Sequence, residues 1–368
     1  MKIALLHDFI GTGTGGAERV LAEFHGLFPD APVYTAYAER SATDKLIPGA
    51  DIRTSSLQKS RLRNRPEYVL LRMPQAIEEF DFNQFDVLLS SSGAYSHGAI
   101  TGPDTFHLCY CHSPMRYAWD WHAEYLNARA GNGMARFVAE GAMSRLRIWD
   151  AVSAKRVDRW IANSQTVAAR ISHFYRQPAT VIYPPVDTAF FDPALAAATP
   201  DKPYAVSVSR LSGTKRLDWA IAAAKQAGID LVIAGEGPDR PRLERLADSS
   251  VRFAGNVTES EKRDLLAGAS CFLFPAEDDF GIAPVEALAM GVPVVAFGKG
   301  GATEYVMDGK NGMVFPEPDT ISFGDVLSRF VSDGVSMDKG EIRTTALAFS
   351  AERFRTQITQ AVQDAHAN

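Results

Sequence analysis

The sequence is poor in cysteine and has no long apolar run. Its three cysteines, Cys109, Cys111 and Cys271, show no CxxC spacing. Neither a disulfide framework nor a zinc site is indicated, and buried reduced thiols are expected. No stretch approaches the roughly 18 apolar residues that a membrane-spanning helix needs. The first apolar run, Ile3–Leu6, is too short for a signal peptide and predicts a buried strand in a cytoplasmic protein.

An excess of basic residues is also missing. The chain has 38 Lys and Arg against 44 Asp and Glu, and its net charge of −6 argues against a nucleic-acid-binding protein as a whole. No internal repeat or low-complexity tract occurs. With 368 residues, 46% of them hydrophobic, the chain is long enough for two domains of about 100–200 residues each.

Short apolar runs alternate with segments of helical periodicity. Near-continuous Val, Ile, Leu, Ala and Phe predict strands that are covered on both faces, as in parallel sheets. These runs are 1–9, 85–92, 105–113, 159–164, 204–211, 229–237, 251–255, 271–276 and 292–297, and helical segments include 217–227, 240–247 and 259–267. The order predicts an α/β protein with two doubly wound domains.

The irregular segment 177–203 predicts the boundary between these domains. The first would contain residues 1–178 and a C-terminal helix of about 350–368, and the second residues 179–349. An apolar stripe on the last helix, formed by Phe349, Phe354, Ile358 and Val362, is suited to packing on the first domain. Packing on its own domain is the alternative.

Two glycine-rich turns follow predicted strands. Gly15 and Gly16 stand in GTGTGGAERV (11–20), where free N–H groups at a helix start could bind an anion or a sugar. The spacing is not GxGxxG, which disfavours a Rossmann dehydrogenase. Gly235 and Gly237 in GEGPDR (235–240) would let the backbone approach a flat base. A tight turn without a ligand is the alternative for both.

Charged residues at two further strand ends indicate a phosphate site. Arg210 ends one strand and Lys215 precedes the next helix, so the pair is suited to a diphosphate, although a solvated loop is the alternative. In FPAEDDFGIAPVEALAMGVPVVA (274–296), acids are followed by a helix start with free N–H groups and a further acid inside the helix. The residues of this motif are Glu277, Asp278, Asp279, Phe280, Gly281, Ile282, Ala283 and Glu286. A helix cap explains any single acid there, but not the whole pattern.

These motifs resemble glycosyltransferase family 4 over almost the whole chain. The resemblance implies retaining enzymes of the GT-B fold, in which two Rossmann-like domains face a cleft and the last helix crosses back to the first domain. In that family a first acid, Phe-Gly and a second acid eight positions after the first form the EX7E signature. Glu286 is the second acid, and the count back gives Asp278, with Glu277 one residue out of register. Both therefore stay candidates for the contact to the donor sugar, with register favouring Asp278.

The resemblance also implies roles for other residues. Arg210 and Lys215 match the pair that holds the donor diphosphate, Gly281 to Ala283 match the loop over phosphate and sugar, and Glu286 matches the acid at the ribose. CHSPMRYAWD (111–120) and GGAERV (15–20) resemble a subgroup that includes mannosyltransferases of surface polysaccharide assembly. There His112 would lie beside the reacting sugar. A buried core group is the alternative for His112. His7 and His97 are weaker candidates, and a hydrogen bond to the backbone is the alternative for both.

The same resemblance implies the partners. The favoured donor is GDP-mannose, with a UDP-sugar as the alternative, and the acceptor is a saccharide on a polyprenyl diphosphate at the inner face of the cell membrane. The departing β-phosphate would take the acceptor's proton, and neither a metal nor a resident cofactor is required. A sugar-nucleotide epimerase of GT-B shape and a non-catalytic binder are the other functions to separate from transfer.

Two basic stretches in the first domain indicate where the protein works. One contains Arg53, Lys59, Arg61, Arg63, Arg65 and Arg72 against Glu67. The other, from Met134 to Trp160, interleaves six basic residues with Phe137, Met143, Leu146, Ile148 and Trp149. A solvated face explains either stretch alone. Together they predict a patch for peripheral binding to the membrane surface.

Overall fold

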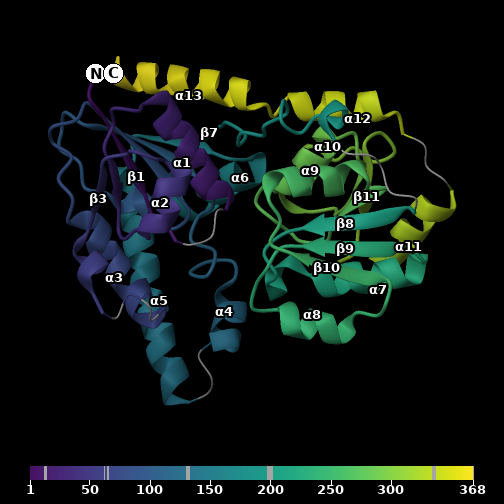
Figure 1. Cartoon of the computed structure of the whole chain (residues 1–368). Coiled ribbons are helices and arrows are strands. Elements are labelled where there is room, and N and C mark those ends of the chain that lie inside the picture. The colour runs from purple at the N-terminus through teal and green to yellow at the C-terminus, as the bar shows by residue number, and fades with distance from the viewer. Residues whose placement is uncertain are drawn as a thin grey trace. The chain divides into compact units, whose positions relative to one another are not determined.

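The computed structural model describes residues 1–11, 15–61, 63, 66–129, 133–196, 202–333 and 337–367. Contacts divide the chain into two compact units: Met1–Pro185 with Phe354–Asn368, and Val186–Arg353. Each unit is a sheet covered by helices (Figure 1). Gly13 of the first glycine-rich turn and Arg65 of the first basic stretch lie outside the described residues.

The first unit contains a seven-stranded sheet in the order β3-β2-β1-β4-β5-β6-β7. All neighbouring strands named in this order pair in parallel. Its strands are β1 (Ile3–His7), β2 (Val33–Thr35), β3 (Ile52–Thr54), β4 (Val87–Ser92), β5 (Phe106–Cys111), β6 (Arg159–Ala162) and β7 (Ala179–Val181). Its helices are α1 (Gly16–Leu27), α2 (Arg40–Leu46), α3 (Pro66–Glu78), α4 (His122–Arg129), α5 (Met134–Ser153), α6 (Gln165–Tyr175) and α13 (Ala351–His366).

The second unit contains a six-stranded parallel sheet in the order β10-β9-β8-β11-β12-β13. Its strands are β8 (Tyr204–Val208), β9 (Asp230–Ala234), β10 (Val251–Gly255), β11 (Cys271–Phe274), β12 (Val294–Phe297) and β13 (Gly312–Phe315). Its helices are α7 (Leu217–Ala227), α8 (Arg240–Leu246), α9 (Glu259–Ala267), α10 (Ile282–Ala289), α11 (Thr320–Ser332) and α12 (Lys339–Leu347). The prediction of two doubly wound α/β domains is confirmed.

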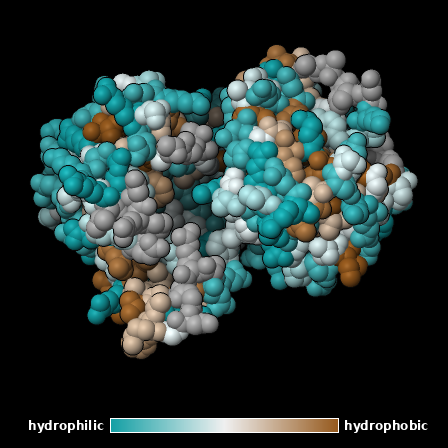
Figure 2. Space-filling view, turned by 60° about the horizontal axis from the view of Figure 1, so that its bottom comes forward, coloured by the Kyte–Doolittle hydropathy of each residue, from teal (hydrophilic) through white to brown (hydrophobic). Residues whose placement is uncertain are grey.

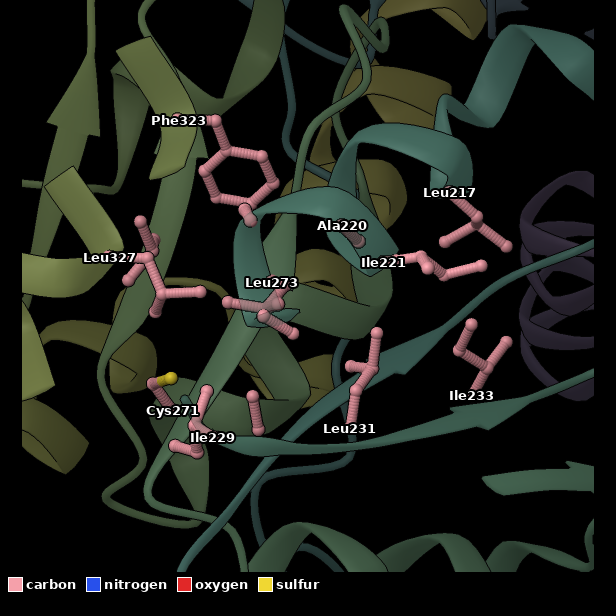
Figure 3. Close-up of a cluster of buried hydrophobic side chains, with 14 of the residues drawn as sticks. Leu217, Ala220, Ile221, Ile229, Leu231, Ile233, Cys271, Leu273, Phe323 and Leu327 are labelled. Atoms are coloured by element: carbon pink, nitrogen blue, oxygen red, sulfur yellow. The ribbon is translucent and has the colours of Figure 1, made fainter. Parts of the chain in front are cut away.

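Packing in the second unit follows from its apolar runs. Residues of α7 and α11, among them Ile221 and Phe323, meet Leu231 of β9 and Leu273 of β11 in one buried cluster (Figure 3). Cys271 belongs to this cluster, and all three cysteines are buried free thiols, as expected. Burying such side chains stabilises the fold by about 25 cal/mol for each Å² of apolar surface removed from water.

Side-chain caps begin several of the helices. The Thr258 hydroxyl accepts from the Glu261 backbone N–H before α9, and the Glu261 carboxylate accepts from the Thr258 backbone N–H at 2.7 Å. The Ser164 hydroxyl accepts from the Val167 N–H before α6 at 3.0 Å. Each cap satisfies an N–H group that the helix itself leaves without a partner, which fixes where the helix begins.

The observed boundary lies later in the chain than 178. The first unit extends to Pro185 because β7 pairs with β6 and so belongs to its sheet. The strands β2, β3 and β7, which the sequence analysis did not predict, have only three residues each. A three-residue strand is too short to show the periodicity on which the sequence analysis relied.

The C-terminal helix packs on the first unit. Phe354, Ile358 and Val362 are buried in one cluster with residues of α1, β1, β4 and β5. The Phe354 ring stacks on Phe24 at 6.0 Å and meets Tyr110 edge-on at 5.8 Å. The expected return of this helix is confirmed for these three residues. Phe349 is different, because it packs on Phe280 and Tyr305 of the second unit.

We expect Phe354→Ala to lower the free energy of unfolding by about 3–5 kcal/mol, because it opens a cavity in a fully buried aromatic cluster. Chemical denaturation would measure this loss. The matched control is Gln363→Ala, an exposed position on the same helix, which should leave stability nearly unchanged. Equal stability of the two variants would contradict the packing of α13 in this core.

Candidate active site

Three polar side chains of the first unit meet at the carboxyl edge of its sheet. The parallel register places His7 of β1 opposite Ser91 of β4. The Ser91 hydroxyl lies 3.0 Å from His7 Nδ1 and 2.8 Å from Nε2 of His112, which follows β5. The strand order reverses between β1 and β4, and ligands of open α/β sheets bind at such a switch point. His112 therefore lies where a ligand is expected.

Asp8 fixes the loop that follows β4. Its carboxylate accepts hydrogen bonds from the backbone N–H groups of 93–96, at 3.0, 2.8, 3.1 and 2.6 Å, and from the Ser96 hydroxyl at 2.5 Å. Charge-assisted bonds of this kind are about twice as strong as neutral ones. This segment begins the turn that carries His97, whose ring lies 3.3 Å from buried Asp150. His97 is thus part of a buried polar network.

His112 is uncharged at neutral pH. Burial, followed by the influence of His7, lowers the pKa of His112 to about 3. A buried imidazole resists protonation because the charged form loses its hydration. His112 can therefore donate or accept a hydrogen bond, but it does not provide a fixed positive charge.

The two cations expected at the second sheet have different surroundings. Arg210, just after β8, is exposed, and its guanidinium makes no ion pair with any residue described by the structure. Lys215 forms an ion pair and hydrogen bond with Asp278, which follows β11. The order of this sheet reverses between β8 and β11, so the Lys215–Asp278 pair stands at its switch point.

A third glycine motif, Gly300-Gly301, holds the acidic loop in place, and the sequence analysis did not include it in the site. The Gly301 N–H donates to the Asp278 carbonyl at 2.8 Å. A Cβ atom on Gly300 would lie 2.5 Å from that carbonyl, and one on Gly301 would lie 2.4 Å from Phe280 Cα. Only glycine allows this approach, so Gly300 and Gly301 hold the loop of Glu277 and Asp278 against the sheet. Glu277 is exposed and Asp278 is half-buried.

The helix start at Gly281 is also held in place. Gly281 has φ +87° and precedes α10. The Tyr305 hydroxyl donates to the Phe280 carbonyl at 2.8 Å, while Phe280 itself is buried. Gly281, Ile282 and Ala283 are partly exposed at the first turn, where a helix presents N–H groups to an anion.

Gly235 and Gly237 also allow two neighbouring loops to pack closely. A Cβ atom on these residues would lie 1.9 Å from the Ser209 carbonyl oxygen and 2.2 Å from that of Leu211. The Leu211 N–H also donates to the Glu236 carbonyl at 3.0 Å. The segment that carries Arg210 thus fills the space in the Cβ direction of both glycines, and the approach of a base to their backbone stays a prediction. Their absent side chains let two neighbouring loops pack together.

The turn before α1 contains an internal acceptor. Glu18 Oε2 lies 2.9 Å from the Gly15 N–H and accepts its hydrogen bond. Gly16 is the first residue of α1. The Gly15 N–H would reach an anion or sugar only by exchanging this partner.

Glu286 is paired in the interior of the second unit. It is 1% exposed, and its two carboxylate oxygens lie 3.0 and 2.8 Å from Lys262 Nζ. Lys262 is 5% exposed, pairs with Glu259 at 2.9 Å and lies 4.8 Å above the Phe191 ring. Sequence analysis missed Lys262. Its place four residues before buried Leu266, on the inner face of α9, is the signal that could have identified it.

No group of three or more His, Cys, Asp or Glu side chains suited to a metal ion occurs in the described part of the chain. The expectation that the reaction requires no metal ion is not tested by this observation and stays a prediction. In the same described part, no helix has the length and apolar character required to cross a bilayer.

The two doubly wound sheets define an α/β protein with two domains, and each sheet has polar residues at its switch point, the place where open α/β sheets bind ligands. The profile of Glycosyltransferase Family 4 matches residues 14–190, and that of Glycosyl transferases group 1 matches residues 202–333. The chain belongs to glycosyltransferase family 4, which confirms the resemblance stated above.

Curated relatives are similar over parts of the chain. Alpha-1,3/1,6-mannosyltransferase ALG2 of Mus musculus is 28% identical over 245 residues, 56% of this chain and 58% of that protein. A GDP-mannose-dependent alpha-(1-6)-phosphatidylinositol dimannoside mannosyltransferase of Mycobacterium tuberculosis is 38% identical over 133 residues, 34% and 35% of the two chains. The chain thus spans about a third to three fifths of these relatives.

Solved structures show the same fold over the full length. Anabaena HepE in complex with UDP has a TM-score of 0.70 at 18% identity, covering 99% of this chain and 100% of that one. Sucrose-phosphate synthase of Thermosynechococcus elongatus has a TM-score of 0.73 at 16% identity, covering 100% of both. The fold is therefore GT-B, as the sequence predicted.

We expect Lys262→Met to lower the free energy of unfolding by about 3–5 kcal/mol, because it removes the ammonium beside the buried Glu286 carboxylate. Adding Glu286→Gln should recover most of that loss, since the buried charge is then gone. Urea denaturation of single and double variants would measure both effects. Lys225→Met is the control: Lys225 is 70% exposed and lies 3.5 Å from Asp248, and such surface pairs contribute about 0–1 kcal/mol. A double variant no more stable than Lys262→Met would contradict the coupling.

Proposed function

We propose that the chain is a retaining glycosyltransferase that moves mannose from GDP-mannose to a saccharide carried on a polyprenyl diphosphate. Residues 1–185 with α13 would bind the acceptor, and residues 186–353 the donor nucleotide. The observation that carries the proposal is the Arg210 and Lys215 pair beside the β8–β11 switch point, in a chain of glycosyltransferase family 4.

In the proposed reaction, the bond between the anomeric carbon and the β-phosphate oxygen breaks. A bond to the acceptor oxygen forms on the same face, and the acceptor proton passes to the β-phosphate. Negative charge grows on the diphosphate, and Arg210, Lys215 and the N–H groups at the start of α10 stabilise it. Because these cations and helix N–H groups stabilise the negative charge on the diphosphate, the proposal includes no metal ion.

The remaining site residues would hold the donor. Glu286 would contact the ribose only by sharing its carboxylate between the ribose hydroxyls and Lys262, its partner in the structure. Asp278, or Glu277 beside it, contacts the donor sugar. Neutral His112 orients that sugar through a hydrogen bond rather than acting as an obligatory base. This role agrees with its lowered pKa of about 3.

The choice of donor rests on the relatives. Mannosyltransferases are prominent among them, and one is named as GDP-mannose-dependent. A UDP-sugar is the second candidate because Anabaena HepE, with the same fold, was solved with UDP. Thermal shift against GDP-mannose and UDP-sugars would identify the donor. Release of free nucleoside diphosphate with and without acceptor would then separate transfer from binding, and product analysis would exclude an epimerase.

We expect Arg210→Ala or Lys215→Ala to lower turnover by roughly 10²–10³-fold, because each removes a charge that stabilises the departing diphosphate. Arg216→Asn is the matched control. The Arg216 guanidinium stacks over Trp219 at 4.0 Å, and Asn tolerates its φ of 51°. Steady-state turnover rates of the folded variants would measure these losses. Near wild-type turnover in either alanine variant would refute the proposed clamp.

The α5 helix supports peripheral binding to a membrane. Its exposed apolar face consists of Met134, Phe137, Val138, Ile148 and Val152, which are 76%, 73%, 63%, 63% and 56% exposed. At 3.6 residues per turn these five positions lie within about 100° of one another around the helix axis, so they share one side of the helix. Figure 2 shows apolar residues gathered at the lower left, in this part of the first unit. Exposed Arg145 lies on the same side of the helix.

The structure changes which residues carry this proposal. Met143 and Leu146 are buried, and Trp149 donates to Glu78 at 2.8 Å, so none of them belongs to the exposed edge. In the first basic stretch, Arg53 pairs with Asp51 and Arg63 with Glu39. We therefore assign the membrane contact to the α5 face, with an anionic leaflet as its partner.

We expect Phe137→Ser and Arg145→Gln each to weaken co-sedimentation with anionic vesicles. The first removes apolar area, and the second removes about 1 kcal/mol of attraction to the leaflet. Ile321→Ser is the control, since Ile321 is 69% exposed on α11 of the other unit. Equal recovery with anionic and neutral vesicles, or binding that is indifferent to salt, would rule out the anchor.

A further inference from the structure

Three consecutive serines at the end of β4 each form hydrogen bonds with different histidines. Ser90 Oγ lies 2.8 Å from His107 Nε2. Ser92 Oγ lies 3.2 Å from His97 Nδ1. Ser91, between them, points to the opposite face of the sheet, because side chains alternate along a strand. It alone contacts both His7 and His112.

The Ser91 hydroxyl couples the two rings. A hydroxyl has one proton to donate and lone pairs that accept, whereas a neutral imidazole has one donor and one acceptor nitrogen. If Ser91 donates to His112 Nε2, it can accept from His7 Nδ1–H, and the reverse arrangement requires the opposite tautomers. One hydroxyl thus ties the tautomer of His112 to that of His7. Ser91 is fully buried and His7 is 3% exposed, so water competes little for these bonds.

The tautomer determines what His112 offers a ligand. With Nε2 bound to Ser91, Nδ1 is the ring nitrogen left for a further hydrogen bond. It is a donor in one tautomer and an acceptor in the other. The low pKa keeps His112 uncharged at neutral pH. The ring therefore exists as one of its two neutral tautomers and not as the cation, in which both nitrogens are donors. The ring plane is also supported by Tyr110, whose ring lies edge-on at 5.2 Å.

We propose that Ser91 and His7 are positioning residues that set the tautomer and orientation of His112 for the donor sugar. The inference rests on the proposed function, in which His112 contacts that sugar. Neither Ser91 nor His7 touches the substrate in this scheme. They act through the hydrogen bonds at 2.8 and 3.0 Å.

The test compares Ser91→Ala with Ser90→Ala. Both serines are on β4, and each variant removes a fully buried hydroxyl that forms a hydrogen bond with a histidine. The two variants should therefore lose similar amounts of stability. Ser91→Ala should lower kcat roughly tenfold, the effect of one lost hydrogen bond of about 1.4 kcal/mol. The donor KM should stay within about twofold, and Ser90→Ala should keep kcat within about twofold of wild type. Equal losses of kcat in the two variants would overturn the inference.

A second readout does not depend on activity. Long-range ¹⁵N correlation spectra of the histidine rings report the tautomer, and the His112 signals are those lost in His112→Gln. Ser91→Ala should shift the His112 nitrogens toward a mixture of tautomers, whereas Ser90→Ala should leave them unchanged. His7→Gln is a further variant that should produce the same shift. Unchanged His112 nitrogens in Ser91→Ala, or in His7→Gln if only that variant folds, would refute the network.

The two proposals fail differently. If the wild-type protein transfers no sugar from any nucleotide donor, the proposed function fails while the spectra still decide whether Ser91 sets the His112 tautomer. If the wild type is active and Ser91→Ala matches Ser90→Ala, the function stands and the positioning role is wrong.

Discussion

Parallel strand pairing at the two switch points is the constraint on which both candidate sites depend. In-register pairing of β1, β4 and β5 brings the ends of three strands to one edge, which is why His7, Ser91 and His112 meet although they are far apart in sequence. In the second unit, β8 and β11 are neighbours in the same way, and the residues that follow them supply Lys215 and Asp278. A slip of one residue in a strand would turn His7 or Ser91 to the opposite face of the sheet.

Much of the fold followed from the sequence because its strands are nearly continuous apolar runs. Candidate ligand residues could be proposed where they stood at predicted strand ends, as for Arg210, His112 and the acidic loop. The supporting residues were harder to find. Ser91 is an ordinary serine in a run of three, and Lys262 lies on the buried face of α9, where side chains are usually apolar. Their importance arises from partners distant in sequence, which periodicity and spacing do not report.

Among the glycines too, the sequence indicated some positions but not the contacts that explain them. Gly235 and Gly237 drew attention as a turn beside a base, yet their lack of a side chain accommodates the carbonyls of Ser209 and Leu211. Gly300 and Gly301 perform a comparable task for the acidic loop, and their sequence signal is a Gly-Gly pair after a buried strand. A glycine motif at a strand end can thus make room for a ligand or for a neighbouring loop. The sequence does not distinguish these two roles, because the difference depends on which backbone lies beside the glycines.

The C-terminal helix connects stability with the site of the first unit. Phe354 meets the Tyr110 ring edge-on at 5.8 Å, and Tyr110 meets His112 at 5.2 Å. The Tyr110 hydroxyl donates to the Ile182 carbonyl at 2.9 Å, which fixes the ring between helix and histidine. Because protein interiors are close-packed, a shift of one of these rings would displace its neighbours. Residues from the end of the chain therefore help to hold the ring of His112, so the return of α13 to the first unit supports the histidine as well as the core.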